Sequence, residues 1–316
     1  MRSFSFLKRT FYVYLLSTCC VVAVKAQTDL DYDMMKKNLY CSGFFYSHSS
    51  WDEYWEGTFK RNNANLGTVT TQMIGYMGNY GISDKLNVLF NIPYVKTKAS
   101  AGTLAGMKGF QDLSLFLKWK PLTFAFGKNN ISLYGVAGFS TPLSNYTADF
   151  LPLAIGLESQ SLMGRIIADY YRGKFFITAS GTYTYRSNIK IDRSSYYTTS
   201  LHSTNEVEMP DVAGFNFRTG YRGKTLIAEV VINSMMTLGG FDITKNNMPF
   251  PSNNMDMTTA GVKLRYEPAR LSNLSLHAES NYTIAGRNVG QSFTVMGGVF
   301  YILNFGKKNS STPKSN

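Results

Sequence analysis

The sequence predicts an all-β protein, a transmembrane antiparallel up-and-down β-barrel of about 12 strands. Three observations predict it: abundant strand-forming residues, segments in which apolar and polar residues alternate, and connections that are alternately short and long. The chain of 316 residues contains 22 Phe and 21 Tyr but only 9 Pro. Aromatic residues favour pleated, half-buried sheets, whereas proline interrupts them.

The alternation is clearest in residues 111–122, where Leu115 and Leu117 alternate with Ser114 and Lys118. Successive side chains of a strand point to opposite faces, so this strand has one apolar and one polar face. Twelve segments of this kind are centred on residues 39–50, 66–80, 85–97, 111–122, 130–142, 159–171, 174–188, 211–222, 224–238, 255–266, 274–285 and 291–305.

The connections between these segments alternate in length. Residues 81–84, Arg172-Gly173 and Gly223 make tight turns. In outer-membrane barrels, periplasmic turns are short and external loops are long. An even number of strands with a long first loop places both termini in the periplasm. The longer set comprises 51–65, 98–110, 143–158, 189–210 and 239–254, and only 286–290 is short.

A soluble β-sandwich is the alternative fold, because its strands also alternate. Sandwich strands usually have five or six residues, whereas a strand that crosses a bilayer needs about 9–11. Charged residues such as Lys118, Lys263 and Glu279 also lie in the middle of their segments. A wetted barrel lumen explains such central charges, so residues 39–305 are expected to form an outer-membrane barrel.

Residues 1–26 have the pattern of a secretory signal peptide. A basic start precedes the apolar stretch 10–24, and Val24 and Ala26 are small residues at the −3 and −1 positions of a cleavage site. This stretch is shorter than the ~20 residues of a membrane-spanning helix. Cys19 leaves one alternative open, which is processing as a lipoprotein at a loosely matching lipobox.

Cleavage would leave Cys41 as the single cysteine, so no internal disulfide is expected. It would also remove four basic residues and lower the formal charge from +12 to +8. That mild excess, without a dense basic run, argues against a nucleic-acid partner. Residues 27–38 are expected to form a short periplasmic leader, and residues 306–316 a disordered periplasmic tail.

The last segment ends on Phe305 and resembles the terminal strands that the outer-membrane assembly machinery recognises. This machinery, outer-membrane lipid and a small-molecule solute are the expected partners. The expected location is the bacterial outer membrane.

Two stretches resemble a known barrel family. Residues 80–95 read YGISDKLNVLFNIPYV, and residues 109–120 read GFQDLSLFLKWK. The pairing resembles the family named for the meta-cleavage pathway of phenol degradation, whose members are related to hydrocarbon and fatty-acid channels. The resemblance implies passage of small, often hydrophobic compounds. Fatty-acid channels carry an N-terminal hatch, but only residues 27–38 precede the first strand here. Any gate is therefore expected from inward-folded loops or lumen side chains.

Alternation places a set of charged residues in the lumen, with nine basic and four acidic members. If the lumen is open, this excess of basic residues would favour anions, whereas charges that pair across the lumen would seal it. Thirteen charged residues and one histidine make up this set: Asp112, Lys118, Lys120, Arg165, Asp169, Lys174, Arg186, Arg218, Arg222, Glu229, Lys263, Arg265, Glu279 and His277.

No catalytic residue, metal site or cofactor is predicted. His48, His202 and His277 are too scattered for a metal cluster, and the chain has no G-x-S-x-G motif. Three functions remain possible. The first is a channel or transporter for small, hydrophobic or weakly anionic molecules. The second is a structural or adhesive barrel with a sealed lumen. The third is a barrel enzyme of the phospholipase type, although His277 would face inward.

The signal-peptide interpretation predicts a mature N-terminus at Gln27. Export followed by peptidase cleavage after Ala26 should give this end, because small residues fit the peptidase pocket. Mass spectrometry of the membrane-inserted protein checks it. An acylated Cys19 would contradict the prediction and indicate a lipoprotein.

Overall fold

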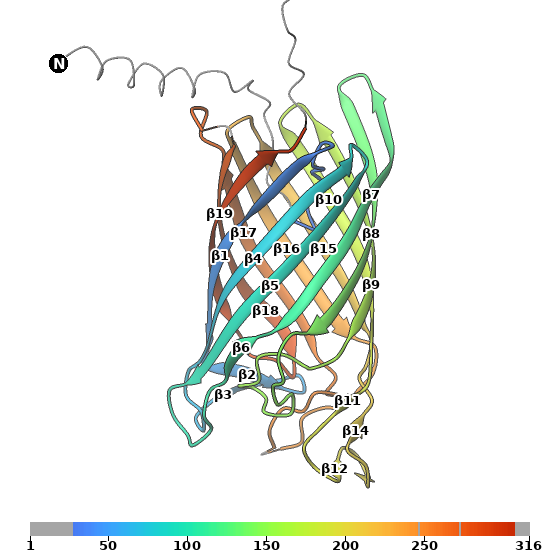
Figure 1. Cartoon of the computed structure of the whole chain (residues 1–316). Helices are drawn as coiled ribbons and strands as arrows, with labels where there is room; N and C mark the ends of the chain where they lie inside the picture. The colour runs from blue at the N-terminus through green and yellow to red at the C-terminus, as the bar shows by residue number, and fades with distance from the viewer. Residues whose placement is uncertain (1–27, 246, 272, 307–316) are drawn as a thin grey trace, which may run out of the picture.

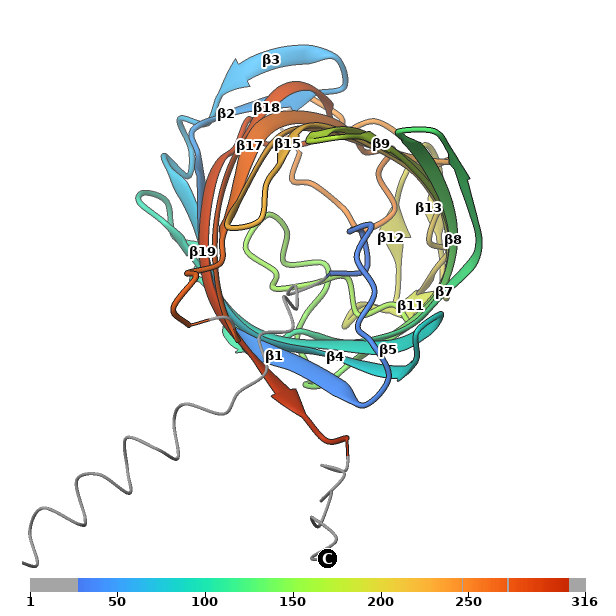
Figure 2. The same ribbon diagram turned by 90° about the horizontal axis from the view of Figure 1, so that it is seen from above.

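The computed structural model describes residues 28–245, 247–271 and 273–306. The predicted signal peptide and residues 307–316 of the predicted tail lie outside this range. Within it, twelve long antiparallel strands curl into a closed barrel (Figures 1 and 2). No helix in the described part of the chain is long and apolar enough to cross a bilayer. The predicted fold class and strand number are confirmed.

Each wall strand overlaps one of the predicted segments. The strands are β1 (Leu39–Trp51), β4 (Val69–Ser83), β5 (Leu86–Ala99), β7 (Asp112–Phe126), β8 (Asn129–Pro142), β9 (Ser161–Arg172), β10 (Phe175–Arg186), β15 (Val212–Arg222), β16 (Leu226–Thr237), β17 (Asp256–Tyr266), β18 (Leu274–Arg287) and β19 (Phe293–Asn304).

The first and last strands close the barrel. β1 pairs with β19 from Leu39, opposite Asn304, to Ser50, opposite Phe293. Every other wall strand pairs with its neighbours in sequence, so the wall has no free edge. Closure matters because the hydrocarbon core offers no hydrogen bonds to exposed backbone groups.

The long connections lie at one end of the barrel and the tight turns at the other, except that the short β18–β19 connection, 288–292, lies at the long-loop end (Figure 1). At the end with short turns, Gly127 and Gly173 have φ angles of 59° and 63°, which glycine adopts at little cost. The long loops at the other end contain the remaining strands: β2 (Glu53–Glu56), β3 (Phe59–Asn62), β6 (Lys108–Phe110), β11 (Ile189–Lys190), β12 (Tyr196–Tyr197), β13 (Leu201–His202) and β14 (Glu206–Val207).

The two faces of the wall differ as the alternation predicts. On β7, Leu115 and Leu117 are 42% and 45% exposed, whereas Lys118 between Leu117 and Trp119 is fully buried. In a water-soluble protein this pattern would be inverted. The apolar outer surface fits a bilayer, and the charged inner surface forms the lumen.

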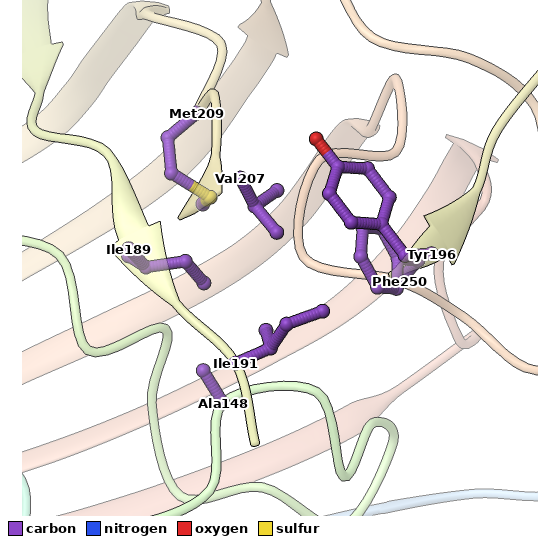
Figure 3. Packing of buried hydrophobic residues seen from close by; sticks show 7 residues of the cluster. All are labelled: Ala148, Ile189, Ile191, Tyr196, Val207, Met209 and Phe250. Carbon is purple, nitrogen blue, oxygen red and sulfur yellow. The ribbon is translucent and has the colours of Figure 1, made fainter. Parts of the chain in front are cut away.

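The loops at the long-loop end have their own apolar cores. Loops 143–160, 187–211 and 238–255 share a buried cluster (Figure 3). Loop 143–160 also reaches the wall, where Tyr146 and Ile155 pack on the buried Val95 of β5. The loops therefore form a packed cover over this mouth of the barrel. The cluster consists of Ala148, Ile189, Ile191, Tyr196, Val207, Met209 and Phe250.

The residues before β1 depart from the sequence prediction. We expected residues 27–38 to be a periplasmic leader, too short to plug the barrel. In the structure, residues 28–38 run inside the ring of strands (Figure 2). Asp31 and Asp33 are only 4% and 8% exposed. The expectation failed because it compared chain lengths with larger plugs, whereas a barrel of this size can be filled by a few ordered residues.

An arginine placed on the outer face should damage assembly more than one placed on the inner face. Leu115→Arg puts a charge among lipid tails and should cost about 2–4 kcal/mol. Ser114→Arg, the matched control, points into the half-buried lumen face. The shift in electrophoretic mobility between folded and heated samples measures assembly. Equal damage from both substitutions would contradict a lipid-facing outer surface.

Candidate functional site

The candidate site is the lumen, where wall cations meet an acidic N-terminal segment. We define this N-terminal segment as residues 28–35, which have no regular secondary structure. Its sequence TDLDYDMM places aspartate at every second position. The backbone turns and bends at residues 29–32, and Asp29, Asp31 and Asp33 contact cations on different strands of the wall.

Asp31 is the centre of the ion-pair network. Its Oδ1 accepts a hydrogen bond from Arg218 at 2.7 Å and lies 3.4 Å from the Lys263 ammonium. Lys118 donates to the backbone oxygens of Thr28 and Asp31. Burial alone would raise the pKa of Asp31, but these cations together hold it well below its usual range. Asp31 therefore stays ionised inside the barrel.

Asp33 and Asp29 make the other two ion pairs. Arg265 of β17 donates to Asp33 Oδ2 at 2.6 Å, and Arg165 of β9 pairs with Asp29. Together the three aspartates contact cations from strands spread around the wall. For a buried pair such as Arg265 and Asp33, removing one partner typically costs about 3–5 kcal/mol, because the other charge is left uncompensated.

Arg222 links the N-terminal segment to a charge on the wall itself. Its guanidinium donates two hydrogen bonds to Asp169, at 3.0 and 3.1 Å. The same guanidinium lies 3.0 Å from the centre of the Tyr32 ring and 4.1 Å from that of Phe176. Cation–π contacts of this kind are strongest when the cation is desolvated. The segment is therefore held by stacking as well as by charge.

Apolar contacts hold the last residue of the N-terminal segment, next to the start of β1. Met35 is fully buried and belongs to a cluster with Leu39, Cys41, Phe300 and Ile302. Gly81 allows the backbone to pass, because a Cβ there would collide with the carbonyl oxygen of Lys36. Deeper in the lumen, Tyr32 and Met34 pack on a second cluster, formed by Tyr134, Val136 and Ile167.

A cavity of about 230 Å³ lies between the N-terminal segment and the wall. Its lining has seven apolar and seven polar or charged residues, together with Gly78. A dry cavity of about 150 Å³ accommodates benzene, so this one has room for a small aromatic or short aliphatic molecule. The lining residues are Thr28, Asp29, Leu30, Met77, Gly78, Leu89, Phe90, Asn91, Phe116, Arg218, Val231, Asn233, Lys263, Glu279 and Met296.

Other predicted lumen residues lie away from the N-terminal segment. Asp112 accepts a hydrogen bond from Tyr146 of the loop cover at 2.7 Å, and Arg186 ends β10 on the same side. Lys120 is half-buried beside an irregularity in the β7–β8 pairing. The prediction was wrong for Lys174, which is exposed in the β9–β10 turn and lies over the Tyr221 ring. The alternation was extended one residue too far into a turn.

Glu229 and Glu279 add acidic groups to the wall. Glu229 is buried, 3.6 Å from Arg218, and Glu279 accepts a hydrogen bond from Asn281. The wall of the lumen therefore carries both signs of charge beside the cavity. The cations still outnumber the wall's own carboxylates there, and the aspartates of the N-terminal segment supply the balance.

His277 is the only predicted lumen histidine, and it forms a pair with a serine. Its Nε2 lies 3.0 Å from Ser275 Oγ, and both residues are buried. The cation Arg265 stands directly opposite His277 in the β17–β18 register. A histidine that acts as a general base must accept a proton, and neighbouring cations oppose that. Among the described residues, no group of three metal-ligating side chains is present.

Comparison with known proteins shows the fold. No family model and no curated protein matches the chain. Among solved structures, an outer membrane channel from Pseudomonas putida F1 is 14% identical with a TM-score of 0.69. The match covers 88% of this chain and 100% of that chain. At this identity the likeness concerns the fold alone, which is that of a bacterial outer-membrane β-barrel.

Two further structures are less similar. The translocator domain of the autotransporter NalP from Neisseria meningitidis is 10% identical with a TM-score of 0.43, over 94% of this chain and 95% of that one. The TodX monoaromatic hydrocarbon channel is 9% identical with a TM-score of 0.40, over 86% and 91% of the two chains.

The acidic N-terminal segment is the part of the site that sequence reasoning missed. A signal for it was present, because the predicted lumen had a basic excess and the leader carried Asp29, Asp31 and Asp33. Each set of charges is the counterpart of the other. The sequence analysis did not match the two sets, because nothing local in the sequence brings residue 31 near residue 263.

The ion-pair network predicts that neutralising the segment will release it. The double variant Asp31→Asn and Asp33→Asn leaves Arg218, Lys263 and Arg265 without their carboxylates, so the segment should leave the lumen more often. Single-channel conductance in planar bilayers should rise severalfold. Asp52→Asn, an exposed loop residue, is the control. Unchanged conductance in the double variant would show that the charges do not retain the segment.

Proposed function

We propose that the protein is an outer-membrane channel for small, hydrophobic or weakly anionic molecules, and that the N-terminal segment closes it. The observation that supports this proposal is that the N-terminal segment occupies the lumen but belongs to no strand of the wall. The segment is held by side-chain ion pairs, stacking and apolar contacts. A barrel built only for structural support has no need of a lumen segment that is separate from its wall.

The cavity beside the N-terminal segment supports this solute class. Leu89, Phe116 and Val231 offer an apolar surface. The lining also contains two cations, Arg218 and Lys263, and two carboxylates, Asp29 and Glu279. Binding sites for small molecules commonly combine a mainly apolar lining with a few placed polar groups. A short fatty acid or an aromatic acid matches both parts. When the segment leaves, its aspartates no longer neutralise the wall cations, so an anion gains attraction.

The barrel size and the sequence resemblance point the same way. Twelve strands lie between eight-stranded barrels, which side chains fill, and sixteen-stranded porins, which hold an aqueous channel. A narrow passage for selected solutes fits this size. The stretches at residues 80–95 and 109–120 resemble the meta-pathway barrel family, and we propose membership on that ground.

Transport by purified protein in liposomes tests the function. Wild-type protein should speed the entry of a small aromatic acid, such as benzoate, and should admit a trisaccharide poorly. Deleting residues 28–34 should raise both rates, because the lumen filling is lost. If neither protein moves any solute, the channel proposal fails and a structural barrel is the better interpretation.

A matched pair of variants tests the cavity as part of the route. Val231→Phe fills the cavity from the inner face, where Val231 is 2% exposed. Ile232→Phe, at the next position, adds a comparable side chain to the lipid face. Benzoate entry should fall severalfold in the first variant and stay at the wild-type rate in the second. Equal rates would place the route elsewhere in the barrel.

A further inference from the structure

Three lysines form a group on the outer surface of the wall. Lys96 and Lys98 belong to β5 and Lys108 to β6, and all three side chains are exposed. They share the outward face of the sheet with Tyr94, because side chains two residues apart on a strand point the same way. The group lies where β5 and β6 approach the long loops (Figure 1).

This arrangement is unfavourable on its own. Lys96 stands directly opposite Lys108 in the β5–β6 register. Like charges in that position destabilise a sheet. Within the described residues, no ion pair neutralises any of the three ammonium groups. An anion supplied by another molecule would remove the repulsion.

The surface next to the lysines is apolar on the side of the membrane. Tyr94 and Phe110 pack edge to face, with ring centres 5.4 Å apart and planes at 83°. They are 37% and 50% exposed, and Ile74, opposite Tyr94 on β4, is 55% exposed. Aromatic pairs of this kind mark the interface between the apolar band and the headgroups. The lysines therefore stand at headgroup depth.

A glutamine lies beside the three lysines at headgroup depth. Gln72 of β4 lies opposite Lys96, and its Nε2 donates to the Tyr46 hydroxyl at 3.1 Å. Cations and an amide thus lie beyond a platform of aromatic and aliphatic side chains. The cations thus lie towards the long loops and the apolar surface towards the middle of the membrane. A lipid with a phosphorylated headgroup has its phosphates and acyl chains in the same order.

We propose that Lys96, Lys98 and Lys108 bind the phosphates of a phosphorylated glycolipid in the outer leaflet, with its acyl chains along Tyr94 and Phe110. The ammonium groups neutralise the phosphates as point charges. The assignment to the outer leaflet rests on the proposed orientation, in which the long loops are outside the cell. It does not depend on which solute the channel carries.

Lipid binding by the purified folded protein tests the proposal. Diphosphoryl lipid A is titrated in detergent, and native mass spectrometry counts bound lipid. Lysines beside an anionic surface contribute about fivefold each, so the triple variant K96Q/K98Q/K108Q should bind roughly a hundredfold more weakly. The matched control is K85Q/K128Q/K224Q, three exposed lysines in the short turns at the opposite end. It should bind like the wild type.

Several results would overturn the proposal. They are unchanged affinity in the triple variant, equal binding of fully dephosphorylated lipid A, and equal binding of phosphatidylglycerol. Displacement of the lipid by inorganic phosphate at equal concentration would indicate a free-anion site instead. A tag at Asn205 that antibodies cannot reach on intact cells would place the lysines in the inner leaflet and also refute it. Failure of benzoate transport alone would refute only the channel function.

Discussion

Neutralising charge inside a narrow barrel is the constraint on which the rest of this structure depends. The wall must turn apolar side chains to lipid, so its polar and charged residues face one another across the lumen. Lys118, Arg218, Lys263 and Arg265 are all buried there. Buried cations are tolerated only when they are paired. The aspartates of the N-terminal segment supply much of that pairing, and this explains why the segment lies inside.

The two ends of the barrel are closed in different ways. At the short-turn end, the N-terminal segment enters the lumen and its charges match those of the wall. At the other end, the loop cover closes over apolar clusters, and Thr97 of β5 donates to the Leu153 carbonyl at 2.6 Å. The cavity lined by Val231 lies beside the N-terminal segment.

The sequence was sufficient to predict the wall because its information is local. Alternation with period two identifies a strand from its own residues, and turn residues such as Gly173 fix where it ends. The same reasoning failed where position depends on distant partners. Nothing near Asp31 in the chain indicates Arg218 or Lys263, and the small strands within the loops, such as β2 and β3, carry no long alternating run. Lys174 shows that the exact end of a strand is also hard to predict from alternation.

Ion pairs hold the N-terminal segment in the lumen without joining it to the strand ladders of the wall. The wall is hydrogen-bonded into a complete ring without the N-terminal segment, so withdrawing residues 28–35 breaks no ladder between strands. Withdrawal separates Asp31 and Asp33 from their cations, but water then solvates both partners. The solvation regained offsets part of the attraction lost. An apolar filling would gain no such compensation. Charge pairing is therefore compatible with the reversible closure that we propose for this lumen.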